Sequence, residues 1–139
     1  MTNKIELSWK GQMLFESVAP EGNVMIDAAP EVGGQGKGLR PKALMLTSLA
    51  GCSAMDVASL LKKMRAEVED FKIEVQANLT EEHPKIYDKV HVIYRFYGND
   101  FKKDKIEKAV KLSVDTYCGV MEMFRKFATV TTEIVYVEQ

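Results

Sequence analysis

The sequence has few of the residues that form disulfide cross-links and metal sites in small proteins. Only two cysteines, two histidines and one tryptophan occur among 139 residues. Two cysteines are too few for a disulfide-based scaffold, and the C-x-x-C spacing typical of zinc or thioredoxin-type sites is absent. His83 and His91 do not have ligand spacing with each other or with the cysteines. We therefore expect no metal site, and no sequence motif calls for another cofactor.

The chain also lacks an excess of charge of one sign and a long apolar run. Its 19 basic and 20 acidic residues nearly balance, which argues against nucleic acid or an anionic membrane as the main partner. The longest uncharged stretch in the middle, residues 43–55, has 13 residues, whereas a membrane-spanning helix needs about 20. The first residues show no apolar signal-peptide run. We expect a cytoplasmic protein, in which thiols stay reduced.

The N-terminal part of the chain has the alternation typical of β-structure. The length fits a single domain over residues 1–139, large enough to form a core without disulfides. Residues 5–10 alternate apolar and polar, and turn signals separate them from further β-segments at 13–18 and 24–27. This pattern predicts a three-stranded meander. Residues 30–40, with four of the nine glycines, predict a mobile loop and match no nucleotide-binding fingerprint.

A long helix is predicted over residues 41–64. Pro41 suits the first helical position, and the helix would span roughly 35 Å. Apolar residues surround nearly the whole of its first half, a pattern typical of a helix buried on all sides. We therefore expect a long buried central helix.

The C-terminal part predicts two paired strands, a helix and a closing strand. Residues 71–78 and 90–96 alternate and predict a hairpin. An amphipathic helix is expected over 102–117, with one or two further helical turns over 120–126, and a β-branched strand over 129–137. The predicted order is βββ-α-ββ-α-β, an α+β fold.

The two cysteines are the main candidates for chemistry. Cys52 lies in a run of small residues on the long helix, and Cys118 precedes a glycine at which a helix would end. A nucleophilic thiol must ionise, so it needs a lowered pKa. Arg40, at the start of the same helix, lies about 18 Å from Cys52 along the helix axis. It could reach that thiol only if the loop folds back or if a partner subunit supplies it. Both cysteines could also be ordinary core residues.

The segment from Gly38 to Val57 resembles the helix signature of the OsmC/Ohr proteins, the osmotically inducible and organic hydroperoxide resistance proteins. That signature has a proline and, about eleven positions later, a cysteine preceded by small residues; Pro41 and Cys52 have this spacing. Cys118 matches the second family cysteine, some 65 residues further on. The expected order of strands and helices fits the family over the whole chain.

The resemblance implies a thiol-dependent peroxidase that reduces organic hydroperoxides as part of an antioxidant stress response. Cys52 would be the peroxidatic nucleophile and Cys118 the resolving thiol, with Arg40 as the activating cation. The Cys52–Cys118 disulfide would be reduced by a small or protein dithiol. The resemblance also implies an intertwined homodimer with its active sites at the subunit interface, and no cofactor.

One departure from the family pattern leaves alternatives open. Peroxidatic members carry a glutamate near the start of the long helix, where this sequence has Lys42 and Ala43. Glu31 could take its place. The main alternative is an OsmC-fold dimer without peroxidase turnover, which senses redox state or binds a small molecule. A third is a structural dimer with two unreactive thiols.

Overall fold

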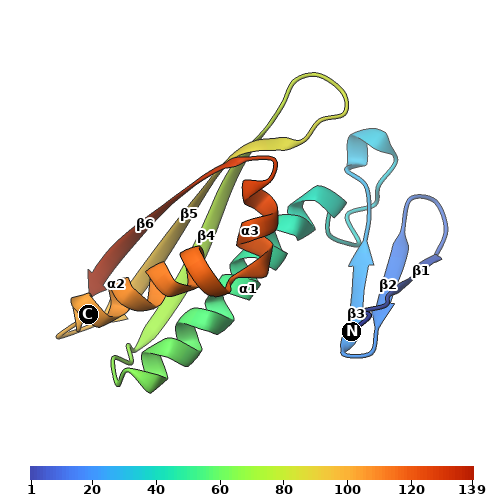
Figure 1. Cartoon of the computed structure of the whole chain (residues 1–139). Coiled ribbons are helices and arrows are strands. Elements are labelled where there is room, and N and C mark those ends of the chain that lie inside the picture. Colours follow the sequence, from blue (N-terminus) through green and yellow to red (C-terminus); the bar gives the residue numbers. More distant parts are fainter. The chain divides into compact units, whose positions relative to one another are not determined.

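The computed structural model describes all residues from 1 to 139, which form two compact units, Met1–Met45 and Leu46–Gln139 (Figure 1). The element order is three strands, a long helix, two strands, two helices and a final strand. The α+β class is confirmed. The predicted order is wrong in one respect, because the segment after residue 117 forms a separate helix rather than a continuation of the preceding one.

The first unit contains the predicted antiparallel meander. Strand β1 (Glu6–Trp9) pairs with β2 (Phe15–Ala19), and β2 pairs with β3 (Gly22–Ile26). The turn between β1 and β2 has Gly11 at a φ of 104° and Gln12 at 52°, left-handed conformations that glycine adopts easily. The glycine-rich segment follows β3 and contains the short 3₁₀ turn Pro30–Val32.

A buried carboxylate fixes this glycine-rich segment. Asp27, 1% exposed, accepts hydrogen bonds from the backbone N–H groups of Ala28 (2.8 Å), Gln35 (2.9 Å) and Lys37 (3.1 Å). These bonds, those of Gln35 and Lys37 first, lower the pKa of Asp27. The segment predicted to be a mobile loop is thus bonded through its backbone to the Asp27 carboxylate.

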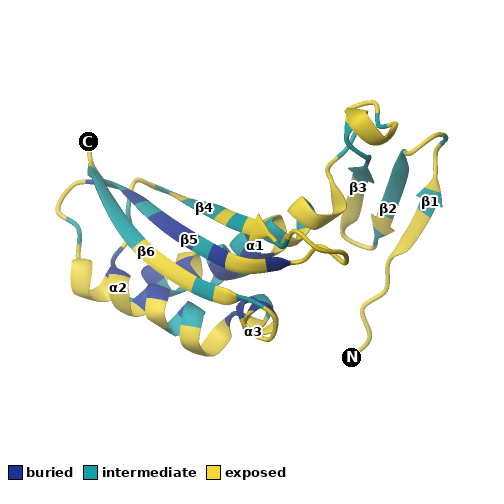
Figure 2. Ribbon diagram, turned by 90° about the horizontal axis from the view of Figure 1, so that it is seen from above, coloured by how far each residue is buried: buried dark blue, intermediate teal, exposed yellow.

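The second unit is a three-stranded sheet covered on one face by helices (Figure 2). Strands β4 (Asp70–Leu79) and β5 (Tyr87–Gly98) form the predicted hairpin, and β6 (Thr129–Glu138) lies parallel to β5. The helices are α1 (Pro41–Lys63), which begins in the first unit, α2 (Lys103–Leu112) and α3 (Gly119–Arg125). A five-residue π-helical turn, Ser113–Tyr117, joins α2 to α3.

The core of the second unit lies between strand β5 and the three helices. Alternate β5 side chains are buried, which gives the strand a continuous apolar face. The fully buried large residues come from all these elements: Leu49, Val57, Val90, Val92, Tyr94, Phe96, Ile106, Met121 and Phe124.

Helix α1 is not buried on all sides, which corrects the prediction from its apolar pattern. Only Leu49, Ser53, Val57 and Leu61 are buried, and their spacing of four residues places them on one stripe. Within the second unit the sheet covers this stripe alone, and Met55 on another side of the helix is 76% exposed. By length and composition α1 could also pass for a membrane span, although a core helix of a soluble protein has the same properties.

Candidate functional site

The second unit brings Cys52 and Cys118 together. Cys52 is half-buried on α1, and Cys118 is 3% exposed at the junction of the π turn and α3. Both are free thiols, and the Cys52 side chain lies close enough to Cys118 to help raise the pKa of the Cys118 thiol. Two residues far apart in sequence are therefore neighbours in the fold, while their catalytic role stays a prediction.

The π turn determines where the Cys118 backbone lies. The Cys118 N–H donates to the carbonyl oxygen of Ser113 over 2.8 Å, closing the wide i to i+5 turn. Cys118 then begins helix α3, and its sulfur accepts a hydrogen bond from the Met121 N–H at 3.4 Å. Single π turns inside helical segments occur frequently at functional sites. This turn replaces the last turn of the helix predicted over 102–117.

Burial raises the pKa of the Cys118 thiol to about 11. The Met121 N–H opposes this shift, while the Cys52 side chain and the negative charge of Asp56 add to it. At neutral pH Cys118 is therefore a protonated thiol that can donate a hydrogen bond. Cys52 is the more exposed of the two residues.

A chain of three buried polar side chains and the half-buried Asp56 links the segments that carry the thiols. The Ser53 hydroxyl oxygen is 2.7 Å from the Tyr94 hydroxyl and 2.8 Å from the Ser113 hydroxyl, and Ser113 donates to a carboxylate oxygen of Asp56 over 2.9 Å. Because an ionised carboxylate only accepts, the Ser113 proton points to Asp56. Ser113 then accepts from Ser53, and Ser53 accepts from Tyr94.

Sequence reasoning missed this polar chain. Ser53, Tyr94 and Ser113 are all 0% exposed, and the family signature that includes Ser53 gives it no role of its own. One signal was available, since Ser53 directly follows Cys52 and falls on the buried stripe of α1. A serine on such a stripe needs a hydrogen-bond partner. The identity of that partner depends on tertiary contacts, which the sequence does not encode locally.

The predicted activating cation lies in the other compact unit. Arg40 directly precedes α1, and its positive charge contributes to lowering the pKa of Asp27. Glu31, the candidate substitute for the family glutamate, is exposed in the 3₁₀ turn of the same unit.

The two histidines lie on strand β5 and in the connection that precedes it. His91 lies with one ring nitrogen 2.7 Å from the Thr131 hydroxyl and the other 2.7 Å from a Glu133 carboxylate oxygen. His83 is exposed in the connection between β4 and β5. No group of three potential metal-ligating side chains occurs in the structure.

An open pocket of about 450 Å³ lies along the second half of α1. Its lining mixes apolar and charged side chains: Met55, Asp56, Ser59, Leu60, Lys63 and Tyr117. Asp56 accepts the hydrogen bond from the buried Ser113, and Tyr117 directly precedes Cys118. The pocket is thus next to the segments that carry the thiols.

The fold and the thiol pair define a small α+β protein built around two adjacent free cysteines. The chain belongs to the OsmC-like protein family, whose pattern matches residues 34–133. It is 33% identical over 91 residues to Protein YhfA of Escherichia coli (strain K12), a match that covers 66% of this chain and 68% of that protein.

Solved structures share the fold over nearly the whole chain. A hypothetical protein from Aquifex aeolicus VF5 is 32% identical with a TM-score of 0.87, covering 100% of this chain and 98% of that one. The organic hydroperoxide resistance protein OhrB of Bacillus subtilis has a TM-score of 0.67 at 20% identity, covering 96% and 98% of the two chains. The predicted OsmC/Ohr membership is confirmed.

Proposed function

We propose that this protein is a thiol-dependent peroxidase that reduces organic hydroperoxides. Cys52 is the attacking thiol and Cys118 the resolving thiol. The observation that carries the proposal is a pair of free cysteines of unequal burial, close enough for Cys52 to raise the pKa of Cys118. The OsmC-like family and the likeness to a protein described as conferring organic hydroperoxide resistance support it.

The first step oxidises Cys52. Its thiolate attacks the distal oxygen of the hydroperoxide, so that an S–O bond forms and the O–O bond breaks. The alkoxide takes up a proton and leaves as an alcohol. Cys52 becomes a sulfenic acid, and the peroxide is reduced by two electrons.

The second step forms the Cys52–Cys118 disulfide. The Cys118 sulfur attacks the Cys52 sulfur, the S–O bond breaks, and the Cys118 proton leaves with the hydroxyl group as water. A small or protein dithiol then restores both thiols by two exchange reactions and becomes a disulfide itself. The protonated state of Cys118 at neutral pH fits this role, because it leaves Cys52 as the group that meets the peroxide.

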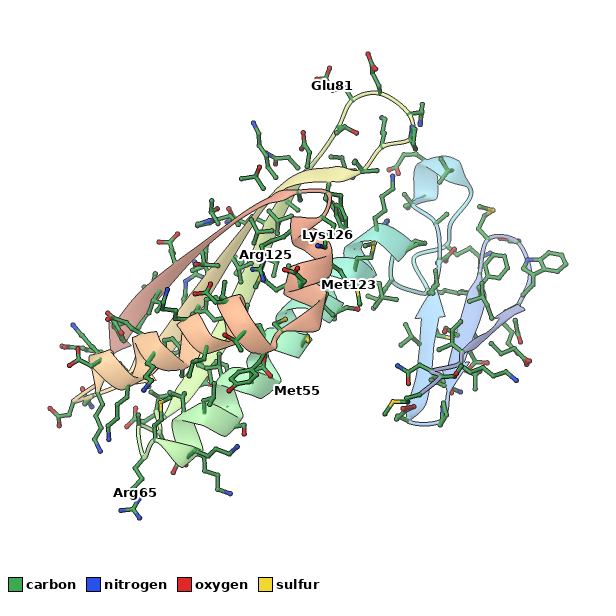
Figure 3. The ribbon with its side chains drawn as sticks, in the orientation of Figure 1. Met55, Arg65, Glu81, Met123, Arg125 and Lys126 are labelled. Carbon is green, nitrogen blue, oxygen red and sulfur yellow. The ribbon has the colours of Figure 1, made fainter.

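The working form in this proposal is a cytoplasmic homodimer. The second unit exposes several large apolar side chains on or next to its helices, among them Met55 (76%) and Met123 (64%), both labelled in Figure 3. Such surfaces are typical of association sites. In the proposed dimer, Arg40 of one subunit or the other stabilises the Cys52 thiolate.

A redox sensor without turnover is the second candidate. Two observations favour it: the raised pKa of Cys118, and the presence of Lys42 and Ala43 where peroxidatic relatives carry a glutamate. In such a protein the disulfide would form slowly and persist until a partner reads it. Turnover distinguishes this candidate from a peroxidase.

The test is consumption of cumene hydroperoxide in the presence of dithiothreitol. We expect multiple turnovers for the wild type and none above background for Cys52→Ser. Cys118→Ser should form a Cys52 sulfenic acid, detectable by dimedone, without forming the internal disulfide. Full activity of Cys52→Ser would refute the proposal, and oxidation of the wild type without turnover would favour the sensor.

A further inference from the structure

Four polar side chains connect the two segments that carry the cysteines. Ser53 directly follows Cys52 on α1, and Asp56 lies one helical turn further along. Ser113 opens the π turn that ends at Cys118. Tyr94 belongs to the central strand β5 and closes the chain of hydrogen bonds at Ser53.

We propose that Ser113 is a positioning residue that holds Cys118 in place for disulfide formation with Cys52. Its role in turnover rests on the proposed peroxidase function. The placement of Cys118 is independent of that function, because it concerns only how readily the two sulfurs join.

Ser113 contacts both the helix that carries Cys52 and the backbone of Cys118. Its hydroxyl bonds to Ser53 and Asp56 of α1, and the hydroxyl also lies 3.4 Å from the Ser53 carbonyl oxygen. Its own carbonyl oxygen accepts the Cys118 N–H at 2.8 Å. A shift of Ser113 along α1 would therefore move the Cys118 backbone relative to Cys52.

Because they are buried, the hydroxyl groups that join Ser113 to α1 all need hydrogen-bond partners. Ser53, Tyr94 and Ser113 are all 0% exposed, and a buried donor or acceptor without a partner is destabilising. The hydroxyls therefore favour a single register between α1 and the π turn. Disulfide formation needs such a register, because the two Cα atoms and the S–S torsion must fall in narrow ranges.

The test uses 5,5′-dithiobis(2-nitrobenzoate) and no peroxide. The Cys52 thiolate attacks one sulfur of the reagent, forms a mixed disulfide and releases one thionitrobenzoate. The Cys118 sulfur then attacks the Cys52 sulfur, the mixed disulfide breaks, and a second thionitrobenzoate and the Cys118 proton are released. The absorbance of thionitrobenzoate separates a bimolecular first phase from an intramolecular second phase.

Ser113→Ala should slow the second phase about tenfold or more, since small misplacements of reacting groups cost rates of this order. The first phase should keep its wild-type rate. Thr116→Val is the matched control, because Thr116 is exposed in the same π turn and the change also removes one hydroxyl. Its two phases should match the wild type. A folded Ser113→Ala protein with a wild-type second phase would overturn the proposal.

Asp56→Asn separates positioning from general support of the fold. The amide oxygen can still accept from Ser113, so the maximal rate of the second phase should stay within about threefold of wild type. Its pH profile should move to lower pH, because the charges facing Cys118 are those of Asp56 and Cys52, with Tyr94 also nearby. An unmoved profile would contradict a place for Asp56 beside the resolving thiol.

Tyr94→Phe is a second variant, to be used if Ser113→Ala does not fold. It removes only the hydroxyl that donates to Ser53 and should slow the second phase less than Ser113→Ala does. If circular dichroism shows Ser113→Ala to be unfolded, a wild-type second phase in Tyr94→Phe overturns the proposal. Two-phase release in a wild type that consumes no hydroperoxide would refute the peroxidase function and support this inference.

Discussion

Cys52 and Cys118 lie near each other but in different surroundings. Cys118 is 3% exposed and caps α3 with its sulfur, whereas Cys52 is half-buried on the long helix α1. A thiol is nucleophilic only as the thiolate, and burial disfavours that form. The difference suits a pair in which Cys52 meets the oxidant and Cys118 reacts afterwards, at short range.

The raised pKa of Cys118 predicts a steep pH dependence of its alkylation. In Cys52→Ser, where Cys118 is the one remaining cysteine, burial still acts as the largest cause of the shift. The iodoacetamide rate should therefore rise about tenfold per pH unit between pH 7 and 9 and keep rising above it. Mass spectrometry of the labelled protein gives this rate. A plateau below pH 9 would contradict the buried thiol.

The same shift predicts a loss of stability at high pH. The pKa of Cys118 is raised from 9.0 to about 11 by folding. Between these values the unfolded chain loses its thiol proton while the folded chain keeps it. The contribution of the buried thiol is thus fully present below pH 9 and is lost as the pH rises towards 11.

At the residue scale, the sequence allowed the cysteines to be predicted but not their supporting hydroxyls. Cys52 and Cys118 stood out by their spacing and their match to a family signature. The hydroxyl oxygens of Ser53 and Ser113 lie 2.8 Å apart only because the π turn packs against α1 in the folded protein. Such a contact depends on packing between distant segments, and no local pattern signals it.

At the scale of elements, regular alternation was a reliable guide and irregular turns were not. The meander, the β4–β5 hairpin and the closing strand all formed where predicted. The π turn at Ser113–Tyr117 was hidden in an apparently continuous helix, because one wide turn hardly changes helical periodicity. Helix α1 had the apolar pattern of a buried helix, but within the second unit only one stripe of its residues is buried.

We expect the stability of the glycine-rich segment to fall in acid. Folding lowers the pKa of Asp27 from 3.8 through its hydrogen bonds to Gln35, Lys37 and Ala28 and through the charge of Arg40. The resulting stability is fully present above pH 3.8 and is lost as the pH falls through the lower folded pKa. Asp27→Asn should remove this acid dependence and weaken the segment at neutral pH.

Trp9 provides the measurement. It is the one tryptophan of the chain and lies on β1 in the same unit as Asp27. Its fluorescence should show an acid transition below about pH 4 in the wild type. Glu31→Gln, an exposed change in the same segment, is the control and should keep that transition. An unchanged transition in Asp27→Asn would show that another carboxylate causes it.

At the scale of the whole molecule, uncovered apolar surface is the most informative feature. Met55, Tyr117 and Met123 are 76%, 59% and 64% exposed in the second unit. Exposed apolar groups of this extent favour association, since burying them removes apolar area from water. The proposed homodimer would supply the cover that the sequence pattern of α1 led us to expect within the chain.

Sedimentation velocity tests this prediction. The wild type should sediment as a dimer at micromolar concentration. Met55→Glu combined with Met123→Glu should shift it towards monomer, because charges buried in an apolar interface are costly. Leu79→Glu, a matched change at a 44% exposed leucine on β4, should remain dimeric. A wild type that is monomeric at all concentrations would contradict the proposed assembly.

Peptide mapping after rapid mixing with one equivalent of cumene hydroperoxide, without reductant, tests the central claim most directly. The thiol pair predicts a Cys52–Cys118 disulfide in most molecules, formed within the wild-type chain and absent from Cys52→Ser and Cys118→Ser. Two free thiols after exposure, or slow oxidation spread over methionines as well, would contradict the claim that these neighbouring cysteines form a reactive pair.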